Sequence, residues 1–172
     1  YASGYKAVKG VDPQAKVLIG ELAPIGGGRA IAPLKFLRDV TCSNAAYKAS
    51  RKCAPLKADG FAIHPYQFQH APNKAAGKPD DVPIGALSRL TSALDKLAKR
   101  HALATPNKRK MELYLTEFGY LTQGKRAQKP KVRAKWLHDA FHVARRNPRV
   151  RQLLQYQLVD PPSHELWHSA IL

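Results

Sequence analysis

Four short segments rich in apolar residues constrain the fold of this chain more than any other sequence feature. They cover residues 16–20, 60–63, 111–115 and 153–159. A continuous apolar run of this length is typical of a strand that is buried on both faces, as in parallel sheets covered by helices. The sequence therefore predicts an α/β fold with four parallel strands.

Helical segments are expected between these strands. Apolar residues spaced three and four apart predict helices over residues 1–10, 87–97 and 131–145. A shorter helix is expected near 33–40, inside the long loop after the first strand. In the last helix the side chains expected to face inward are Trp136, Ala140, Phe141 and Ala144. Alternating strands and helices over 172 residues predict one α/β domain.

Polar side chains follow each apolar run. Glu21 follows the first, His64 and Tyr66 the second, Glu117 the third and Asp160 the fourth. In a parallel barrel the carboxyl ends of the strands converge on one face, where active sites are built. We therefore expect these side chains to surround one hollow. The alternative for each residue alone is structural: a carboxylate that binds loop amides or caps a helix, a core histidine, or a packed tyrosine.

Three segments that contain these residues resemble consecutive late strands of retaining glycoside hydrolases of clan A, particularly bacterial cellulase-like members. The segments are residues 16–24, 59–66 and 113–120, and Thr-Glu-Phe-Gly-Tyr at 116–120 is the most diagnostic part. The resemblance implies that residues 1–172 are the carboxyl-terminal half of a (β/α)8-type barrel, with only the last four parallel strands and their helices. It also implies cleavage of β-linked glycans by double displacement.

The resemblance assigns roles to individual residues. Glu117 falls at the position of the catalytic nucleophile, at the end of the seventh barrel strand. Tyr66 occupies a position from which a tyrosine hydroxyl donates to that nucleophile, and His64 lines the site beside it. Glu21 lies one strand after the usual general acid, so we expect a substrate-contacting or structural carboxylate.

Three further residues are candidates for substrate binding. Tyr120 ends the diagnostic segment, Asp160 follows the last predicted strand, and Trp167 lies in the polar loop beyond it. An indole ring in such a loop is suited to stacking on a sugar. We treat sugar stacking by Trp167 as a hypothesis of equal weight to a packing role.

The Asn-Glu-Pro segment that carries the general acid in the resembling family does not occur in this sequence. We therefore expect the isolated chain to hydrolyse little or nothing, and expect an amino-terminal half or a second copy of the chain to close the barrel. The alternative is a non-catalytic carbohydrate-binding protein on the same scaffold. No metal or organic cofactor is expected, since carboxylate chemistry requires neither and no ligand cluster is present.

The formal net charge is +17, which raises the possibility of a polyanion partner. The 29 lysines and arginines are spread through every segment, and no stacking aromatic residues are interleaved with them. We therefore do not favour nucleic acid as the partner, and rank a basic polyanion-binding domain third. No apolar run approaches the roughly 18 residues of a membrane span.

The two cysteines, Cys42 and Cys53, lie in a loop rich in small and polar residues, without the CxxC spacing of a metal site. We favour a disulfide over two free thiols. A disulfide implies an oxidising compartment, and so a secreted or extracellular protein, which the resemblance places in bacteria.

Overall fold

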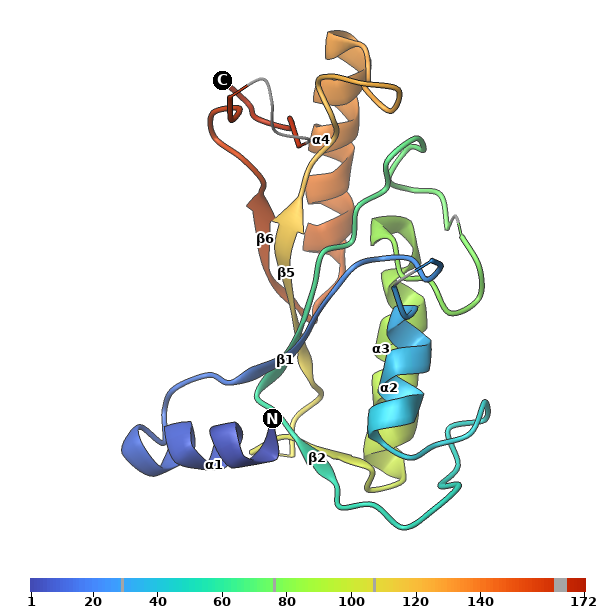
Figure 1. Ribbon diagram of the computed structural model, residues 1–172, viewed down its shortest axis with the longest axis vertical. Helices are drawn as coiled ribbons and strands as arrows, with labels where there is room; N and C mark the ends of the chain where they lie inside the picture. Colours follow the sequence, from blue (N-terminus) through green and yellow to red (C-terminus); the bar gives the residue numbers. More distant parts are fainter. Residues whose placement is uncertain (29, 76, 107, 163–166) are drawn as a thin grey trace.

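The computed structural model describes residues 1–28, 30–75, 77–106, 108–162 and 167–172, and shows an α/β fold built on a four-stranded sheet (Figure 1). All neighbouring strands are parallel, and their order in the sheet follows their order in the chain. The strands are β1 (Leu18–Leu22), β3 (Gly60–Ile63), β5 (Glu112–Phe118) and β6 (Val150–Gln155). The predicted parallel α/β fold is confirmed.

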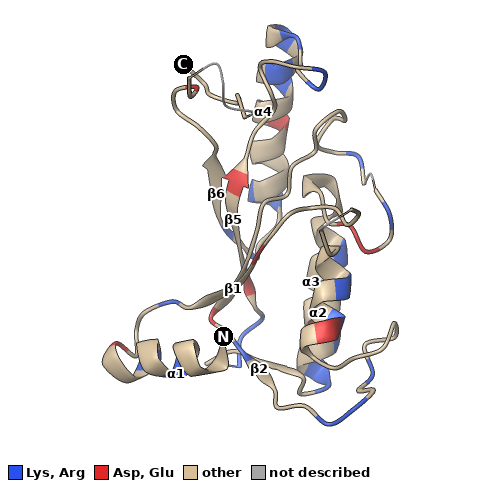
Figure 2. Cartoon of the chain, viewed as in Figure 1, with Lys and Arg blue, Asp and Glu red and all other residues tan. Residues whose placement is uncertain are grey.

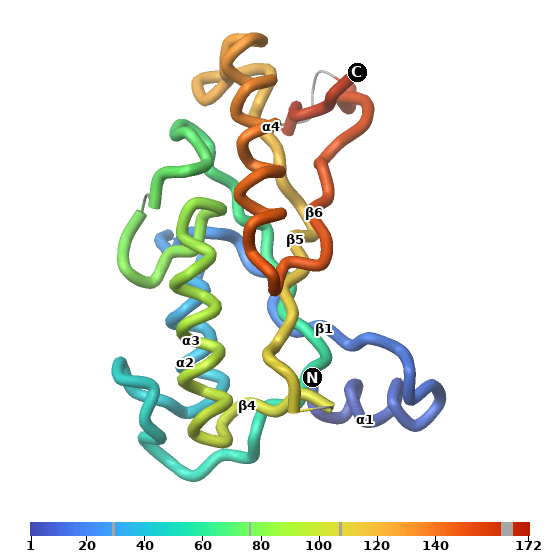
Figure 3. The backbone as a smooth tube through the Cα atoms, turned by 180° about the vertical axis from the view of Figure 1, so that it is seen from behind, coloured from blue at the N-terminus to red at the C-terminus, as the bar shows by residue number. Residues whose placement is uncertain are grey.

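A helix follows each of the first three strands, as expected for repeated β/α units. They are α2 (Pro33–Val40), α3 (Leu87–Lys99), which continues from the 3-10 turn η1 (Ile84–Ala86), and α4 (Pro130–Arg146). Helices α2 and α3 lie side by side along the sheet in both opposing views (Figures 1 and 3). Proline occupies the first turn of both α2 and α4, where its missing N–H costs no helical hydrogen bond.

A second, very small sheet lies at the amino-terminal ends of the main strands. It pairs β2 (Leu56–Lys57) in parallel with β4 (Leu103–Ala104), and helix α1 (Ala2–Val11) lies beside it (Figure 1). Tyr1 ties the start of α1 to this sheet, because its hydroxyl donates to the Lys57 carbonyl at 2.9 Å. The sequence did not predict β2 or β4, since two residues are too few to show a periodicity.

The core lies between the central strands and the helices. Its largest fully buried side chains on these elements are Leu37, Phe61, Ile63, Leu90, Leu94, Leu97, Leu113, Leu115 and Phe118. Strand β3 is buried along its whole length, as predicted for a strand covered on both faces. Strands β1 and β6 are only partly buried, because no described strand pairs with their outer edges.

The prediction for the last strand was wrong in its bounds. Strand β6 covers Val150–Gln155 and not residues 153–159, and Leu158 and Val159 beyond it are 61% and 66% exposed. An edge strand with one wetted face tolerates alternating polar residues such as Arg151. The predicted segment therefore begins after the observed start of β6 and ends in the loop beyond it.

Helix α4 also differs from its prediction at one position. Ala140 and Ala144 are buried and Trp136 packs against the core, as predicted, but Phe141 is 45% exposed. Phe141 follows Ala140 directly, and one residue advances a helix by about 100°. The Phe141 ring is therefore carried out of the buried stripe.

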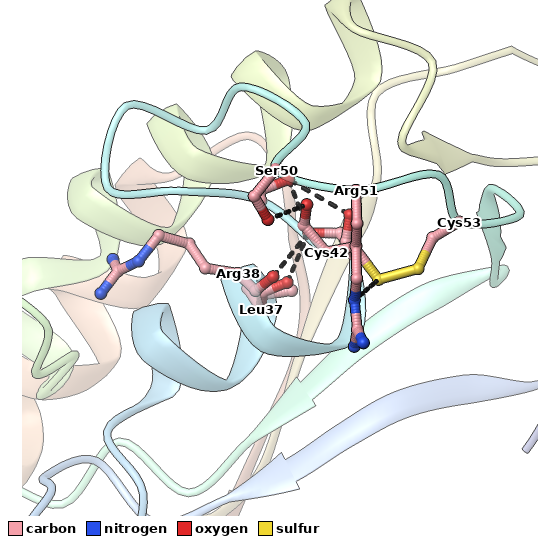
Figure 4. Close-up of a disulfide and its surroundings, with 8 residues drawn as sticks. Leu37, Arg38, Cys42, Ser50, Arg51 and Cys53 are labelled. Carbon is pink, nitrogen blue, oxygen red and sulfur yellow. Dashed lines mark hydrogen bonds between the residues drawn. A yellow bond between two sulfur atoms is a disulfide. The ribbon is translucent and has the colours of Figure 1, made fainter.

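The predicted disulfide joins Cys42 to Cys53 and closes a loop that follows α2 (Figure 4). Cys42 is buried, and its carbonyl accepts hydrogen bonds from the backbone N–H of Ser50 at 2.8 Å and from the Ser50 hydroxyl at 2.8 Å. The loop is thus held by the covalent link and by backbone hydrogen bonds. Within the described ranges, no helix has the length and apolar character needed to cross a membrane.

Reducing this disulfide should lower the free energy of unfolding by about 2–3 kcal/mol, the value expected from the entropy of closing a short loop. Urea denaturation with and without a reductant measures the change. The double substitution Cys42→Ser with Cys53→Ser should show the same shift without reductant. Coincident unfolding midpoints for oxidised and reduced protein would contradict this expectation.

Candidate functional site

The carboxyl ends of β1, β3 and β5 bring four polar side chains into one hydrogen-bonded network. Glu21 comes from β1, His64 follows β3, and Thr116 and Glu117 come from the end of β5. The Thr116 hydroxyl donates to Oε1 of Glu21 at 2.7 Å. Residues far apart in the sequence therefore meet at the carboxyl ends of the strands, where the sequence analysis expected them.

The imidazole of His64 bridges the two carboxylates. Its Nε2 lies 2.6 Å from Oε1 of Glu21, and its Nδ1 lies 3.2 Å from Oε2 of Glu117. A neutral imidazole can donate from only one nitrogen, so both contacts are hydrogen bonds to carboxylates only when both nitrogens carry protons. The imidazole ring of His64 therefore lies between the carboxylates of Glu21 and Glu117.

A bulge in β1 aims Glu21 at this network. The register between β1 and β3 shifts between Gly20 and Leu22, and Glu21 has a φ of 56°. Gly20 is required beside it, because a Cβ at Gly20 would lie 2.3 Å from the carbonyl oxygen of Ala62. Positive φ at a residue other than glycine is uncommon and concentrates at functional sites.

A second bulge shapes the end of β5. Leu115 pairs with Leu153 and Phe118 with Gln155, so β5 has one residue more than β6 across this interval. Consecutive strand residues normally point to opposite faces, whereas Thr116 and Glu117 both join the network. The sequence analysis missed Thr116, although a polar residue directly before Glu117 at the end of an apolar run was a usable signal.

Tyr66 contacts the same oxygen of the Glu117 carboxylate as His64 does. Its hydroxyl donates to Oε2 of Glu117 at 3.0 Å. A tight turn at Pro65, in which the Tyr66 N–H donates to the His64 carbonyl at 2.9 Å, brings both side chains to the same carboxylate. Burial, and then the negative charge of Glu117, raises the pKa of the Tyr66 hydroxyl far above its usual value, so the hydroxyl stays protonated.

Three aromatic rings surround this hydrogen bond. The ring of Phe68 stacks on that of Tyr66 with centroids 5.6 Å apart, and the Trp167 ring meets Tyr66 edge-on at 5.0 Å. Trp167 also meets Phe68 edge-on at 5.9 Å. The structure thus places Trp167, which is partly exposed, beside the partner of Glu117. Phe68 was not singled out from the sequence.

The remaining two candidates lie outside this network. Tyr120 is fully buried, contacts Phe118 and Trp136, and its hydroxyl donates to the His70 carbonyl at 3.0 Å. Asp160 lies well beyond the end of β6 and accepts hydrogen bonds from the Ala170 N–H and the Thr122 hydroxyl. Although partial burial opposes it, these bonds hold the pKa of Asp160 below its usual value. Neither side chain joins the Glu117 network.

The sequence matches no protein-family profile and no curated protein. A solved structure, described as a family 39 glycoside hydrolase from the gut symbiont Bacteroides cellulosilyticus WH2, superposes with a TM-score of 0.62 over 98% of this chain. This chain is therefore similar in fold to part of that hydrolase. The sequence identity is 19%, and the match spans 32% of the hydrolase chain, about one third of its length.

The strand-end network can also be described by its chemistry alone. A carboxylate that accepts a tyrosine hydroxyl and faces an imidazole is held in one orientation and has the chemistry of a nucleophile or a base. Among the described residues, no group of three or more histidines, cysteines or carboxylates is arranged to hold a metal ion. The chemistry available in the described network is that of two carboxylates, an imidazole and two hydroxyl groups.

Proposed function

We propose that this chain is the carboxyl-terminal half of a (β/α)8-barrel retaining glycoside hydrolase that acts on β-linked glycans, with Glu117 as its nucleophile. The observation that carries the proposal is the setting of Glu117. Its carboxylate lies at the end of a parallel strand, accepts the Tyr66 hydroxyl at 3.0 Å and faces Nδ1 of His64 at 3.2 Å. These contacts fix the orientation of an attacking oxygen before substrate binds.

In the proposed reaction, an oxygen of Glu117 attacks the anomeric carbon and the glycosidic oxygen departs with the leaving group. Water then hydrolyses the glycosyl-enzyme ester, so the product retains the configuration of the substrate. Glu21 accepts hydrogen bonds from Thr116 and His64 on a single oxygen. We therefore assign to Glu21 the positioning of His64, and not the donation of a proton to the leaving group.

The half-barrel assignment is supported by the strand order. Strands β1, β3, β5 and β6 are neighbours in chain order, without the reversal that defines a doubly wound sheet. No described strand pairs with the outer edges of β1 and β6, where a barrel would continue. In this proposal an amino-terminal half or a second copy of the chain supplies the remaining strands and the general acid.

The place of action follows from the same proposal. The Cys42–Cys53 disulfide supports an oxidising compartment. The solved neighbour comes from a gut bacterium. We therefore propose a secreted bacterial protein that meets its glycan outside the cell.

Labelling of Glu117 tests the assignment directly. The probes are 2,4-dinitrophenyl 2-deoxy-2-fluoro β-glycosides of several sugars, whose leaving group departs without a proton donor. The fluorine destabilises both oxocarbenium-like transition states, so the covalent ester accumulates. Incubation of the full 172-residue chain should add one glycosyl group, and peptide mass spectrometry should locate it on Glu117.

The matched control is Glu117→Gln, which keeps the size of the side chain and removes the attacking oxyanion. This variant should remain unlabelled and should keep the melting temperature of the parent. A label on a different residue, or equal labelling of Glu117→Gln, would overturn the assignment. Glycosides with ordinary leaving groups should be hydrolysed little or not at all, because this proposal assigns no described residue to protonate the leaving group.

A second candidate function is carbohydrate binding without catalysis. The packed rings of Tyr66, Phe68 and Trp167 beside Glu117 favour it, because aromatic rings bind sugar faces whether or not chemistry follows. Calorimetry with β-linked oligosaccharides distinguishes the two functions. Binding that is lost in Trp167→Ala, combined with no labelling of Glu117, would favour the binding protein.

A further inference from the structure

A pocket of about 230 Å³ is lined in part by Tyr66, the residue whose hydroxyl donates to the proposed nucleophile. Its lining includes Tyr66, Phe68, His70, Pro83 and Arg126. The volume is below the roughly 300 Å³ at which sites for drug-sized ligands begin, which suits one sugar unit of a longer chain. Tyr66 donates its hydroxyl to Glu117 and also lines this pocket, so one residue belongs to both the network and the pocket.

Arg126 is held over this pocket with its donors unused. Its guanidinium lies 5.0 Å from the centre of the Phe68 ring, in cation–π contact. Among the described residues its guanidinium makes no hydrogen bond and no ion pair, unlike that of Arg38, which forms two hydrogen bonds with Asp80. A stacked guanidinium keeps its N–H edge free, and that edge matches a carboxylate with two parallel hydrogen bonds.

Two segments beside the pocket carry positive charge that is mostly unpaired. Residues 66–79, and residues 118–138 from the end of β5 into α4, contain no aspartate or glutamate, and the two segments contact each other where the Gln128 amide donates to the Phe68 carbonyl. Lys135 pairs with Asp139. Figure 2 shows the lysines and arginines gathered at the start of α4 and in its preceding loop. Six exposed cations here form no ion pair with a described residue: Lys74, Lys78, Lys125, Arg126, Lys129 and Lys131.

Cations elsewhere in the fold are more often compensated. Lys9 pairs with Asp59 at 2.8 Å, and Arg149 pairs with Asp95 at 2.6 Å. Cations without an ion pair to a described residue also occur elsewhere, for example Lys6 and Lys52, so the absence of aspartate and glutamate is what distinguishes the two segments beside the pocket.

We propose that this pocket recognises a uronic acid unit of a β-linked glycan, with Arg126 binding its carboxylate and Phe68 contacting its ring. The inference rests on the proposed function, because it names the substrate class of that same site. The remaining loop cations would meet further carboxylates along the chain and raise the rate of encounter. Glu117 then receives the sugar unit next to the recognised one.

An acidic glycan suits this surface better than nucleic acid does. The pocket has the volume of one sugar ring, whereas single strands require a continuous groove with successive stacking rings. The Glu117 carboxylate contacts Tyr66, which lines the pocket, and it would repel a continuous row of phosphates. A sugar chain presents a neutral glycosidic carbon at that position.

Calorimetry at physiological ionic strength tests the proposal with two β-1,4-linked hexasaccharides, oligomannuronate and neutral cellohexaose. Oligomannuronate should bind the full-length chain and cellohexaose should bind at least tenfold more weakly. Arg126→Ala should weaken oligomannuronate binding about tenfold, the usual effect of losing hydrogen bonds to a charged group. Arg126→Lys keeps the charge and loses the paired donors. Its affinity for oligomannuronate should lie between those of the parent and Arg126→Ala.

Arg109→Ala is the matched control, because Arg109 is also exposed and unpaired but lies in the loop that precedes β5, at the opposite ends of the strands. It should bind oligomannuronate as the parent does. Equal binding of both hexasaccharides would overturn the uronic acid inference, and labelling of Glu117 would still report on the proposed function. An equal loss in Arg109→Ala, or equally tight binding of polyglutamate or single-stranded DNA, would also overturn it.

Discussion

Glu117→Ala should lower the turnover of 2,4-dinitrophenyl β-glycosides by at least about a thousandfold, because it removes the attacking atom itself. The activated leaving group departs without a proton, so this substrate isolates the role of the nucleophile. The parent and variant are compared by the absorbance of released dinitrophenolate. Removal of the side chain leaves Tyr66 and His64 in place around a small space.

Azide provides the decisive second measurement. As a small anion it can enter the space left by Glu117→Ala and attack the anomeric carbon from the face that the carboxylate used. Dinitrophenolate release should then recover, and the product should be the α-glycosyl azide, identified by NMR. Recovery with the β-anomer, or full activity without azide, would contradict the assignment.

Glu112→Gln is the matched control for this experiment. Glu112 begins the same strand, but it pairs with Lys16 and Arg151 and does not join the Glu117 network. Its replacement should leave turnover of the activated glycoside within about twofold of the parent and should not respond to azide. A parallel loss in both variants would point to a general disturbance of β5.

Phe61→Ala should lower the free energy of unfolding by about 3–5 kcal/mol, which is the usual cost of removing a buried phenyl ring. Phe61 is completely buried in the central strand β3, and its ring packs beneath Gly20 of β1. The loss is a large fraction of the roughly 5–15 kcal/mol that stabilises a typical domain. Urea denaturation followed by circular dichroism measures it.

The same substitution at an exposed phenylalanine calibrates the result. Phe141→Ala, on the outer side of α4, should change the free energy of unfolding by less than about 1 kcal/mol. If Phe61→Ala proves too unstable to purify, Phe61→Leu should show a smaller loss in the same direction. Equal effects at both phenylalanines would contradict the burial of Phe61 in the core.

The elements that the sequence predicted best are those in which local pattern and tertiary setting agree. Strand β3 and helix α2 were predicted with their observed bounds, because one is apolar throughout and the other begins at a proline. Strand β6 was misplaced, since its position depends on which edge of the sheet it occupies. Periodicity reports burial, and the burial of an edge strand is set by neighbours distant in the sequence.

The residues of the candidate site divide in the same way, into those that a local sequence pattern indicates and those that depend on tertiary contacts. Glu21, His64, Tyr66 and Glu117 were predictable, because each is a polar residue at or after the end of an apolar run. Phe68 and Arg126 were not, because their contact joins two loops, and no local pattern encodes which loops meet. Tyr120 was assigned by its place in a motif, although the turn after β5 directs its ring into the core.

The imidazole bridge from Glu21 to Glu117 has a mechanical consequence. Glu21 belongs to β1, whose outer edge is the border of the described sheet, and His64 passes any movement of that carboxylate to Glu117. A strand added alongside β1 would therefore change the orientation of the proposed nucleophile before substrate binds. In the proposed barrel, closure of the sheet and alignment of the attacking group would then be a single event.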